Sequence, residues 1–274
     1  MPHDQPTHAA YDPASFWETR LRSSFSLDGV GFRGLGKPFN AALYRQRLIV
    51  LDRTLRRFRV TIAGSDIVEL GPGTGFYVSE WQRLGAGSVV GLDITQVSRD
   101  QLRERFPAYR FEQADVTTPW PVGDDSADVV AAFDVLFHVV DDARLAVALG
   151  ECARVLRPGG TLLISDLFLH GPAMIGFHQV VRPLDQFAAL LEGAGFEILG
   201  RVPVFVTMQP AIDLSPGRRR ALAGRWWAWL EGRLREQPRR GYLLGRVLGW
   251  TDRAITYPLR EGPSIEILVA RTPR

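Results

Sequence analysis

The chain has 274 residues, of which 46% are hydrophobic and 23% are charged, and its formal net charge is +3. These values are typical of a soluble globular protein built as one large domain, or as one domain with substantial additions. No run of eighteen apolar residues occurs, so no transmembrane helix is expected.

The single cysteine and the first residues set the expected location. Cys152 has no second cysteine to pair with and cannot build a cysteine metal site, so we predict a cytoplasmic protein. The start, "MPHDQPTHAAYDPASF", lacks the basic segment and apolar core of a signal peptide, and we expect a frayed N-terminus.

Residues 14–60 show helical spacing of apolar residues on both sides of a break. The break, "LDGVGFRGLGKPFN" at 27–40, carries four glycines and predicts a flexible loop. Two interpretations stay open for this loop, a simple connection and a segment that closes over a ligand.

From residue 66 onward, short apolar segments alternate with helical ones. The predicted strands are "DIVEL", "SVVGLDI", "YRFEQADV", "ADVVAAFDVL" and "TLLISDLFL", and a helix separates most of them. Strands that alternate with helices indicate a parallel sheet covered on both faces.

The last third of the chain interrupts this pattern. After a strand at "EILGRVPVFV", residues 210–262 are predicted to be helical, and "SIEILVARTP" is a final strand. The expected fold is α/β, a seven-stranded doubly wound Rossmann-like sheet with an N-terminal helical cap and a helical insertion before the last strand. The expected division is 1–60 for the cap, 61–209 for the core, 210–262 for the insertion and 263–274 for the last strand.

The segment "VELGPGTGFYV" places three glycines directly after the first strand. Ligands bind outside the carboxyl ends of strands in such sheets, and Gly71, Gly73 and Gly75 lie at that edge. A dinucleotide fingerprint needs its third glycine one residue later, where this chain has Phe76. Because that side chain would obstruct close helix–strand packing, an NAD(P)-dependent oxidoreductase is the weaker alternative.

Three acidic residues flank the glycines. Glu69 lies at the end of the first strand, Asp93 ends the second strand and Asp115 ends the third. A carboxylate at the position of Asp93 can bind both hydroxyls of a ribose. The alternatives are a helix cap for Asp93 and hydrogen bonds to backbone amides near the loop for Glu69, and Asp115 alone is a weaker signal than Asp93.

Six motifs in this order resemble the class I S-adenosylmethionine-dependent methyltransferases of the bacterial small-molecule type. They are "VELGPGTGFY", "VVGLDIT", "EQADV", "FDVLFHVVDD", "LRPGGTLLISD" and "LLEGAGFEI", and the resemblance covers residues 60–205 and 264–272. It implies S-adenosylmethionine as cofactor.

The resemblance also assigns roles by position. The three glycines would approach the methionyl part of the cofactor, and Asp93 would hold its ribose. The adenine would lie near Ile94, Asp115 and Val116, and Phe133 and His138 would line the site.

The expected reaction is methyl transfer to a small-molecule or lipid-like acceptor at oxygen, in a natural-product, glycan or quinone pathway. A hydroxyl acceptor needs a base, and the candidates are His138, His170, His178 and Asp166. Each histidine has the alternative of a purely structural role. Asp141 and Asp142 fit a helix start, so no metal is expected. A non-catalytic module that keeps the fold is a further alternative.

The insertion is rich in arginine and tryptophan. In its first helix, Leu222, Trp226, Trp229 or Leu230, and Leu234 are predicted to share one face; Leu244, Val247, Leu248, Thr251 and Ile255 repeat the theme in the second. Three interpretations compete: helices packed on the sheet edge, a lid over an apolar acceptor, and a peripheral membrane contact through 217–258. No nucleic acid is expected as a partner, because the overall charge is only +3.

Overall fold

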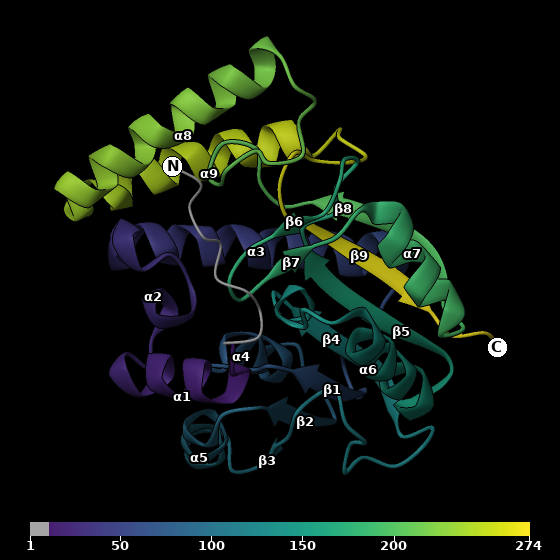
Figure 1. Ribbon diagram of the computed structural model, residues 1–274. Coiled ribbons are helices and arrows are strands. Elements are labelled where there is room, and N and C mark those ends of the chain that lie inside the picture. Colours follow the sequence, from purple (N-terminus) through teal and green to yellow (C-terminus); the bar gives the residue numbers. More distant parts are fainter. Residues whose placement is uncertain (1–10) are drawn as a thin grey trace.

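A seven-stranded sheet forms the centre of the computed structural model, which describes residues 11–274 (Figure 1). The strand order is β3-β2-β1-β4-β5-β9-β8. The strands are β1 (Asp66–Leu70), β2 (Ser88–Asp93), β3 (Arg110–Gln113), β4 (Ala127–Phe133), β5 (Leu156–Asp166), β8 (Glu197–Pro203) and β9 (Glu266–Arg271). Of the segment expected to be frayed, residues 1–10 lie outside the described residues, and the first helix begins at Pro13.

The direction of the strands follows a doubly wound pattern. The strands β1 to β5 are parallel to their neighbours, whereas β9 is antiparallel to both β5 and β8. The order of the chain reverses between β1 and β4, so the loops after these strands diverge and leave a crevice at their carboxyl ends. The predicted fold class is confirmed.

Helices cover both faces of the sheet (Figure 1). The longer helices are α1 (Pro13–Ser23), α3 (Gly36–Phe58), α4 (Phe76–Arg83), α5 (Gln96–Arg105), α6 (Asp142–Val155), α7 (Leu184–Gly193), α8 (Arg218–Glu236) and α9 (Gly241–Thr256). Short turns of helix are α2 (Leu27–Val30), η2 (Arg33–Leu35), η3 (Leu136–His138) and η4 (Pro238–Arg240). A two-stranded hairpin, β6 (Met174–Ile175) and β7 (Val180–Val181), is not predicted from the sequence.

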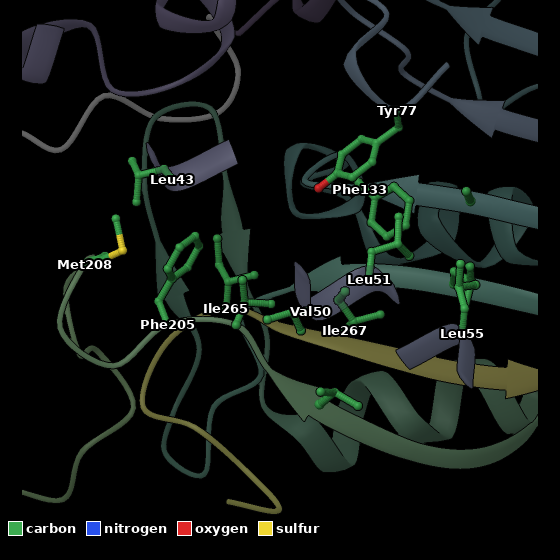
Figure 2. Packing of buried hydrophobic residues seen from close by; sticks show 14 of the residues in the cluster. Leu43, Val50, Leu51, Leu55, Tyr77, Phe133, Phe205, Met208, Ile265 and Ile267 are labelled. Atoms are coloured by element: carbon green, nitrogen blue, oxygen red, sulfur yellow. The ribbon is translucent and has the colours of Figure 1, made fainter. Parts of the chain in front are cut away.

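Two hydrophobic cores lie on opposite faces of the sheet, because strand side chains point alternately to either face. In β1, Ile67 joins the core under α3, and Val68 joins the core under α6 and α7. Figure 2 shows Leu51 and Leu55 of α3 together with Ile267 of β9 in the first core. The N-terminal helices therefore share one core with the sheet.

The glycine-rich segment 27–40 is not a flexible loop. It forms α2 and η2, and α3 already begins at Gly36. The side chain of Asn40 accepts a hydrogen bond from the Phe32 amide (3.0 Å) and donates to the carbonyls of Phe32 and Gly36. A Cβ atom at Gly31 would lie 2.4 Å from the Asn40 Oδ1 atom. Gly31 is thus needed for a compact turn around one buried amide.

The insertion forms two helices, α8 and α9, between β8 and β9, as the fold prediction required. α9 packs closely on α3 through glycines: a Cβ atom would lie 2.9 Å from the Phe39 Cβ at Gly241, and 2.4 Å from the Ala42 Cβ at Gly245. The division of the chain at residues 60, 209 and 262 stays a prediction.

Candidate active site

A cavity of about 780 Å³ opens at the carboxyl ends of β1 to β4. The opposite wall comes from α1 to α3, the β6–β7 hairpin and α8. The predicted site residues that line it are Glu69, Gly71, Gly73, Asp93, Ile94, Asp115, Val116, Phe133, His138 and His178. Within the described chain, Gly75, Asp166 and His170 are not among the residues that line this cavity.

The glycine loop has the backbone conformation that its sequence suggests. The φ angles of Gly71, Gly73 and Gly75 are 58°, 53° and 75°, a region that favours glycine. A Cβ atom at Gly75 would lie 2.5 Å from Leu102 of α5. The expected role of Gly75 beside the cofactor is therefore not supported, since this glycine serves the packing of the loop against α5.

Asp93 connects the glycine loop to the start of α5. Its Oδ2 accepts a hydrogen bond from the Gly73 amide (2.9 Å), and its Oδ1 accepts from the Thr95 amide (2.9 Å) and hydroxyl (2.7 Å). The helix cap that was the alternative interpretation for Asp93 is provided by Thr95, whose hydroxyl accepts a hydrogen bond from the Ser98 amide (3.3 Å). Because an ionised carboxylate has about four acceptor positions, one remains for a ligand in the cavity.

Asp115 is held in place by two partners at the rim of the cavity. Its Oδ1 accepts from the Thr117 amide (2.9 Å) and hydroxyl (2.6 Å), and its Oδ2 pairs with Arg144 (2.6 Å). Ile94 and Val116 line the cavity beside it. This is the arrangement of one apolar wall and one acidic group that an adenine would need.

Glu69 is buried beneath the glycine loop. Its Oε2 accepts a hydrogen bond from the Trp81 indole (2.7 Å). Burial raises the pKa of the carboxyl to about 8, and the nearby charge of Asp93 adds to the rise. Glu69 is therefore mainly protonated at neutral pH and can donate a hydrogen bond into the cavity.

Two histidines stack on each other at the far wall. The rings of His138 and His178 are 5.3 Å apart, and the His138 Nδ1 lies 2.8 Å from the His178 carbonyl oxygen. Burial lowers the pKa of His138 to about 4 and also lowers the pKa of His178. Phe16 stacks on the other side of His178 (5.0 Å). Both imidazoles are thus neutral at pH 7.

The other two candidate bases lie elsewhere. The His170 Nδ1 is 2.6 Å from Asp213 Oδ2, half of the side chain is exposed, and this hydrogen bond raises the pKa of His170. Asp166 is buried and accepts from the Leu167 amide, and burial raises its pKa well above the usual value. The positions of His170 and Asp166 do not support a catalytic role for either.

Comparison with known proteins matches one family to a segment that contains both the parallel strands and the glycine loop. The family described as "Methyltransferase domain" matches residues 68–164, from the end of β1 to β5. A probable S-adenosylmethionine-dependent methyltransferase of Mycolicibacterium smegmatis is 32% identical over 168 residues, which cover 59% of this chain and 62% of the relative.

Residues 68–164 therefore form a methyltransferase domain of the S-adenosylmethionine-dependent class.

An O-methyltransferase of Penicillium expansum is another relative of this chain. It is 28% identical over 194 residues, which cover 64% of this chain and 69% of the relative. Across the first four curated relatives, the match spans between 55% and 69% of their length. Members of that class use S-adenosylmethionine as methyl donor, and the cavity fits it because Gly71 and Gly73 line the cavity beside the Asp93 carboxylate, which keeps one acceptor position for a ligand.

Solved structures show the same fold at lower identity. The [4+2]-cyclase SpnF superposes with a TM-score of 0.55 over 83% of this chain and 80% of its own, at 20% identity. The fold therefore supports more than one chemistry, and the reaction has to be argued from the site.

An ion pair between a buried arginine and a partly buried aspartate in the cavity was missed by sequence reasoning. Arg47 of α3 lies 2.6 Å from Asp134, which follows β4 and has a φ of 58°. Asp134 also exchanges hydrogen bonds with Ser165. Both residues line the cavity together with Tyr44, whose pKa burial raises to about 12. Arginines are frequent in this chain, so nothing in the sequence marked Arg47 as buried.

The described residues contain no cluster of three or more His, Cys, Asp or Glu side chains that could hold a metal ion. Also in residues 11–274, no helix combines the length and the apolar character needed to cross a membrane.

Proposed function

We propose that the protein transfers a methyl group from S-adenosylmethionine to a hydroxyl of a small, apolar or lipid-like acceptor. One observation carries the proposal: a single cavity joins the predicted cofactor residues to a second, mainly apolar half. That second half is lined by Trp17, Leu43, Tyr44, Phe76, Ile175 and Ile265, among others. Apolar walls with a few polar groups are typical of small-molecule sites.

Oxygen as the acceptor atom is supported by two features. The relative from Penicillium expansum is named an O-methyltransferase. In addition, the neutral imidazole of His178 lies on the cavity wall, where a base for a hydroxyl is needed. A natural-product, glycan or quinone acceptor remains the proposed substrate class, from the resemblance in sequence.

The reaction is a displacement at carbon. S-adenosylmethionine supplies an electrophilic methyl group on a positively charged sulfur. The protein holds the acceptor oxygen in line with that methyl, so that orientation provides much of the rate. As the new O–CH₃ bond forms and the S–CH₃ bond breaks, the hydroxyl proton passes to a nitrogen of His178. The products are the methylated acceptor, neutral S-adenosylhomocysteine and a protonated imidazole.

The side chains of Tyr77 and Phe133 pack together in the wall of the proposed methyl-transfer site. Their rings stack at 4.1 Å, both line the cavity, and Phe133 ends β4. Next to them, the Arg47–Asp134 pair fixes α3 against the end of β4. These contacts hold the apolar half of the cavity at a constant distance from the glycine loop.

A nicotinamide cofactor fits less well. Phe76 begins α4, lines the cavity and contacts the ring of Tyr44 at 4.6 Å. Its side chain fills the position where a dinucleotide fingerprint requires glycine. A non-catalytic module with the same fold is the remaining alternative, and only an assay of turnover excludes it.

The proposal is tested first by calorimetry with S-adenosylhomocysteine, S-adenosylmethionine, NAD and NADP. We expect binding of the two adenosyl sulfur compounds alone, and exclusive binding of a dinucleotide would overturn the proposal. Asp93→Ala should weaken S-adenosylhomocysteine binding about tenfold to a hundredfold, because a charge-assisted hydrogen bond contributes about 1.5–3 kcal/mol. Asp100→Ala, an exposed residue of α5, is the control and should leave the affinity unchanged.

A further inference from the structure

Exposed apolar side chains gather on α8 and α9. Of thirteen large hydrophobic residues that are exposed in the described chain, eight lie within residues 218–257, called here the helical hairpin. They are Leu222, Trp229, Tyr242, Leu243, Val247, Trp250, Ile255 and Tyr257. Figure 1 places both helices at one end of the molecule, far from α5 and β3. Such a concentration on one part of a surface marks a site of contact.

α9 has one face for the protein and one for the outside. The glycines at 241 and 245 approach α3, and Asp252 is buried on the same side. Leu243, Val247 and Trp250 follow the spacing i, i+4, i+7 and lie on the opposite face. Their exposed fractions are 67%, 54% and 69%. This outer strip is apolar over about two helical turns and has no partner within the described chain.

α8 repeats the arrangement. Leu230 and Leu234 are fully buried in the core under α3, and Trp226 donates its indole hydrogen bond to the Thr207 carbonyl (2.9 Å). Leu222 and Trp229, one face further round, are 64% and 48% exposed. Their exposure is therefore not a sign of poor packing, because the helix already has a buried face.

The helical hairpin carries a net positive charge, whereas the rest of the chain carries a net negative charge. The hairpin contains ten arginines and three acidic residues, whereas the remainder of the chain has four more acidic than basic residues. Of the three acids, Asp252 is buried and Glu231 pairs with Arg235 (2.8 Å). In residues 11–274, no ion pair is recorded for Arg218, Arg219, Arg225, Arg239, Arg240, Arg246 or Arg253. The outer surface of the hairpin is thus strongly positive.

We propose that the helical hairpin docks onto an anionic lipid surface. Tryptophan, tyrosine and leucine side chains among arginines are what an interfacial helix presents, the apolar groups entering the acyl boundary and the cations pairing with lipid phosphates. The net positive charge of the hairpin is complementary to such a surface. The acidic remainder of the chain orients the molecule, because the same surface repels it.

Two other occupants fit less well. A symmetric dimer would place the same patch on both copies, so the ten arginines of one hairpin would face those of the other. A single-stranded nucleic acid would stack on aromatic rings but would have no use for the exposed aliphatic groups of Leu222, Leu243 and Val247.

Docking also places the cavity near the lipid. Glu231 and Arg235 of α8 line the cavity, and Trp227 of the same helix contacts Phe32 at 5.7 Å. A hairpin held at the surface therefore brings the apolar half of the cavity next to the source of a lipid-like acceptor. This last step rests on the proposed function, whereas the docking itself does not.

Vesicle sedimentation of the full chain tests the docking. Vesicles of phosphatidylcholine alone should leave the protein in solution, and vesicles that also contain phosphatidylglycerol should sediment it at low salt. Arg246→Gln with Arg253→Gln should lower the partition coefficient about thirtyfold, from the usual contribution of an arginine near an anionic surface. Leu243→Ser with Trp250→Ser should lower it at least tenfold.

Matched variants serve as controls. Arg103→Gln with Arg110→Gln removes two half-exposed arginines near β3, and Val147→Ser removes an exposed apolar group on α6. All variants should keep the melting temperature and the affinity for S-adenosylhomocysteine, which separates loss of docking from loss of fold or of the proposed function.

Three results would overturn the proposal. The first is equal sedimentation with neutral and anionic vesicles, or with neither. The second is a dimer in light scattering that Leu243→Ser and Trp250→Ser dissolve, which would assign the strip to a second copy. The third is tight binding of a single-stranded RNA that depends on the arginines and not on Leu243.

Discussion

His178 and His170 are eight residues apart in the sequence, yet they lie in opposite environments. His178 lies between the rings of His138 and Phe16 on the cavity wall, and burial lowers its pKa. His170 is half exposed beside Asp213, and this neighbour raises its pKa. Of these two histidines only His178 lines the cavity, and its lowered pKa keeps it unprotonated at neutral pH.

His178→Ala should lower kcat about a hundredfold to ten-thousandfold, since a positioned base contributes that much. Binding of S-adenosylhomocysteine should be unchanged, because the imidazole contacts the acceptor side. Methyl transfer from labelled S-adenosylmethionine measures the first quantity and calorimetry the second. His170→Ala is the control and should retain full turnover.

The pH profile of kcat/KM distinguishes the same two residues. As the pH falls, a base is protonated and the rate is lost. A base with a lowered pKa therefore keeps its rate until the pH is below 6.5, whereas a base with a raised pKa starts to lose its rate while the pH is still above 6.5. Loss of activity in His170→Ala, with an acid limb above pH 6.5, would assign the base to His170.

Glu69→Gln should change how stability depends on pH. The carboxyl pKa is about 8 in the folded protein and near 4.5 in the unfolded chain. Between these values only the folded state keeps the proton, so the free energy of unfolding falls as pH rises from about 4.5 to 8. The amide has no such loss and should be more stable at pH 8 by a few kcal/mol, at about 1.4 kcal/mol for each pKa unit.

Denaturant unfolding at pH 5 and pH 8 measures this difference. Trp81 keeps its acceptor in Glu69→Gln, because the amide oxygen can replace the Oε2 atom. Equal pH dependence in both proteins would show that Glu69 is ionised in the folded state.

The positions of some site residues could be predicted from the sequence, whereas the charge state and the ion pairs of others could not. The place of Asp93 and Asp115 at the ends of strands followed from the strand pattern alone. The protonation of Glu69 and the pair between Arg47 and Asp134 depend on burial between elements far apart in the chain, which no local pattern encodes.

At the scale of elements, α9 shows how glycine can stabilise a helix contact that it weakens in isolation. Gly245 costs helix propensity, yet it lets the backbone of α9 approach Ala42. On α8, a Cβ atom at Gly232 would meet nothing within 4 Å. Gly232 and Gly245 can therefore be compared directly, because both lie within a helix but only Gly245 is in close contact with another helix.

Gly245→Ala should destabilise the protein by about 1–3 kcal/mol, because the new methyl group would overpack the contact with α3. Gly232→Ala should stabilise it by about 0.5–1 kcal/mol through helix propensity. Thermal or urea unfolding of both variants checks the two signs. Stabilisation by both would mean that α9 does not pack closely on α3.

The faces of α8 and α9 were predicted only in part. The buried residues Leu230, Leu234 and Leu248 were on the expected faces, but Leu222, Trp229, Val247 and Ile255 are exposed. The prediction placed these apolar residues together on one face of each helix and left open whether that face meets the sheet, an acceptor or a membrane. A single face is the wrong description, because each helix has two apolar strips, one buried against the protein and one exposed.

For the whole molecule, the two halves of the cavity differ in how far the sequence predicts them. The cofactor half comes from loops that follow consecutive strands, so motifs in chain order locate it. The apolar half is assembled from Trp17 of α1, Tyr44 of α3, Ile175 of β6 and Ile265, which directly precedes β9. These residues are more than 200 positions apart at the extremes, and only the tertiary fold brings them together.

The shared core predicts that the N-terminal cap and the sheet unfold as one unit. Leu51 and Leu55 of α3 belong to the same buried cluster as Val129 of β4. Hydrogen exchange of peptides from α3 and β4 should therefore report the same opening free energy. A lower value for α3 would make the cap an independent unit, as the division at residue 60 suggests.

The inserted segment that contains α8 and α9 leaves the sheet and returns to it at neighbouring positions. Pro203 and Glu266 are partners in the register of β8 and β9. A tight turn could join the same two strands, so the sheet is indifferent to the length and content of what is inserted between them. Evolution can then exchange the contents of this segment, and with it the environment in which the enzyme works, while the cofactor loops and the chemistry at the other strand ends are inherited unchanged.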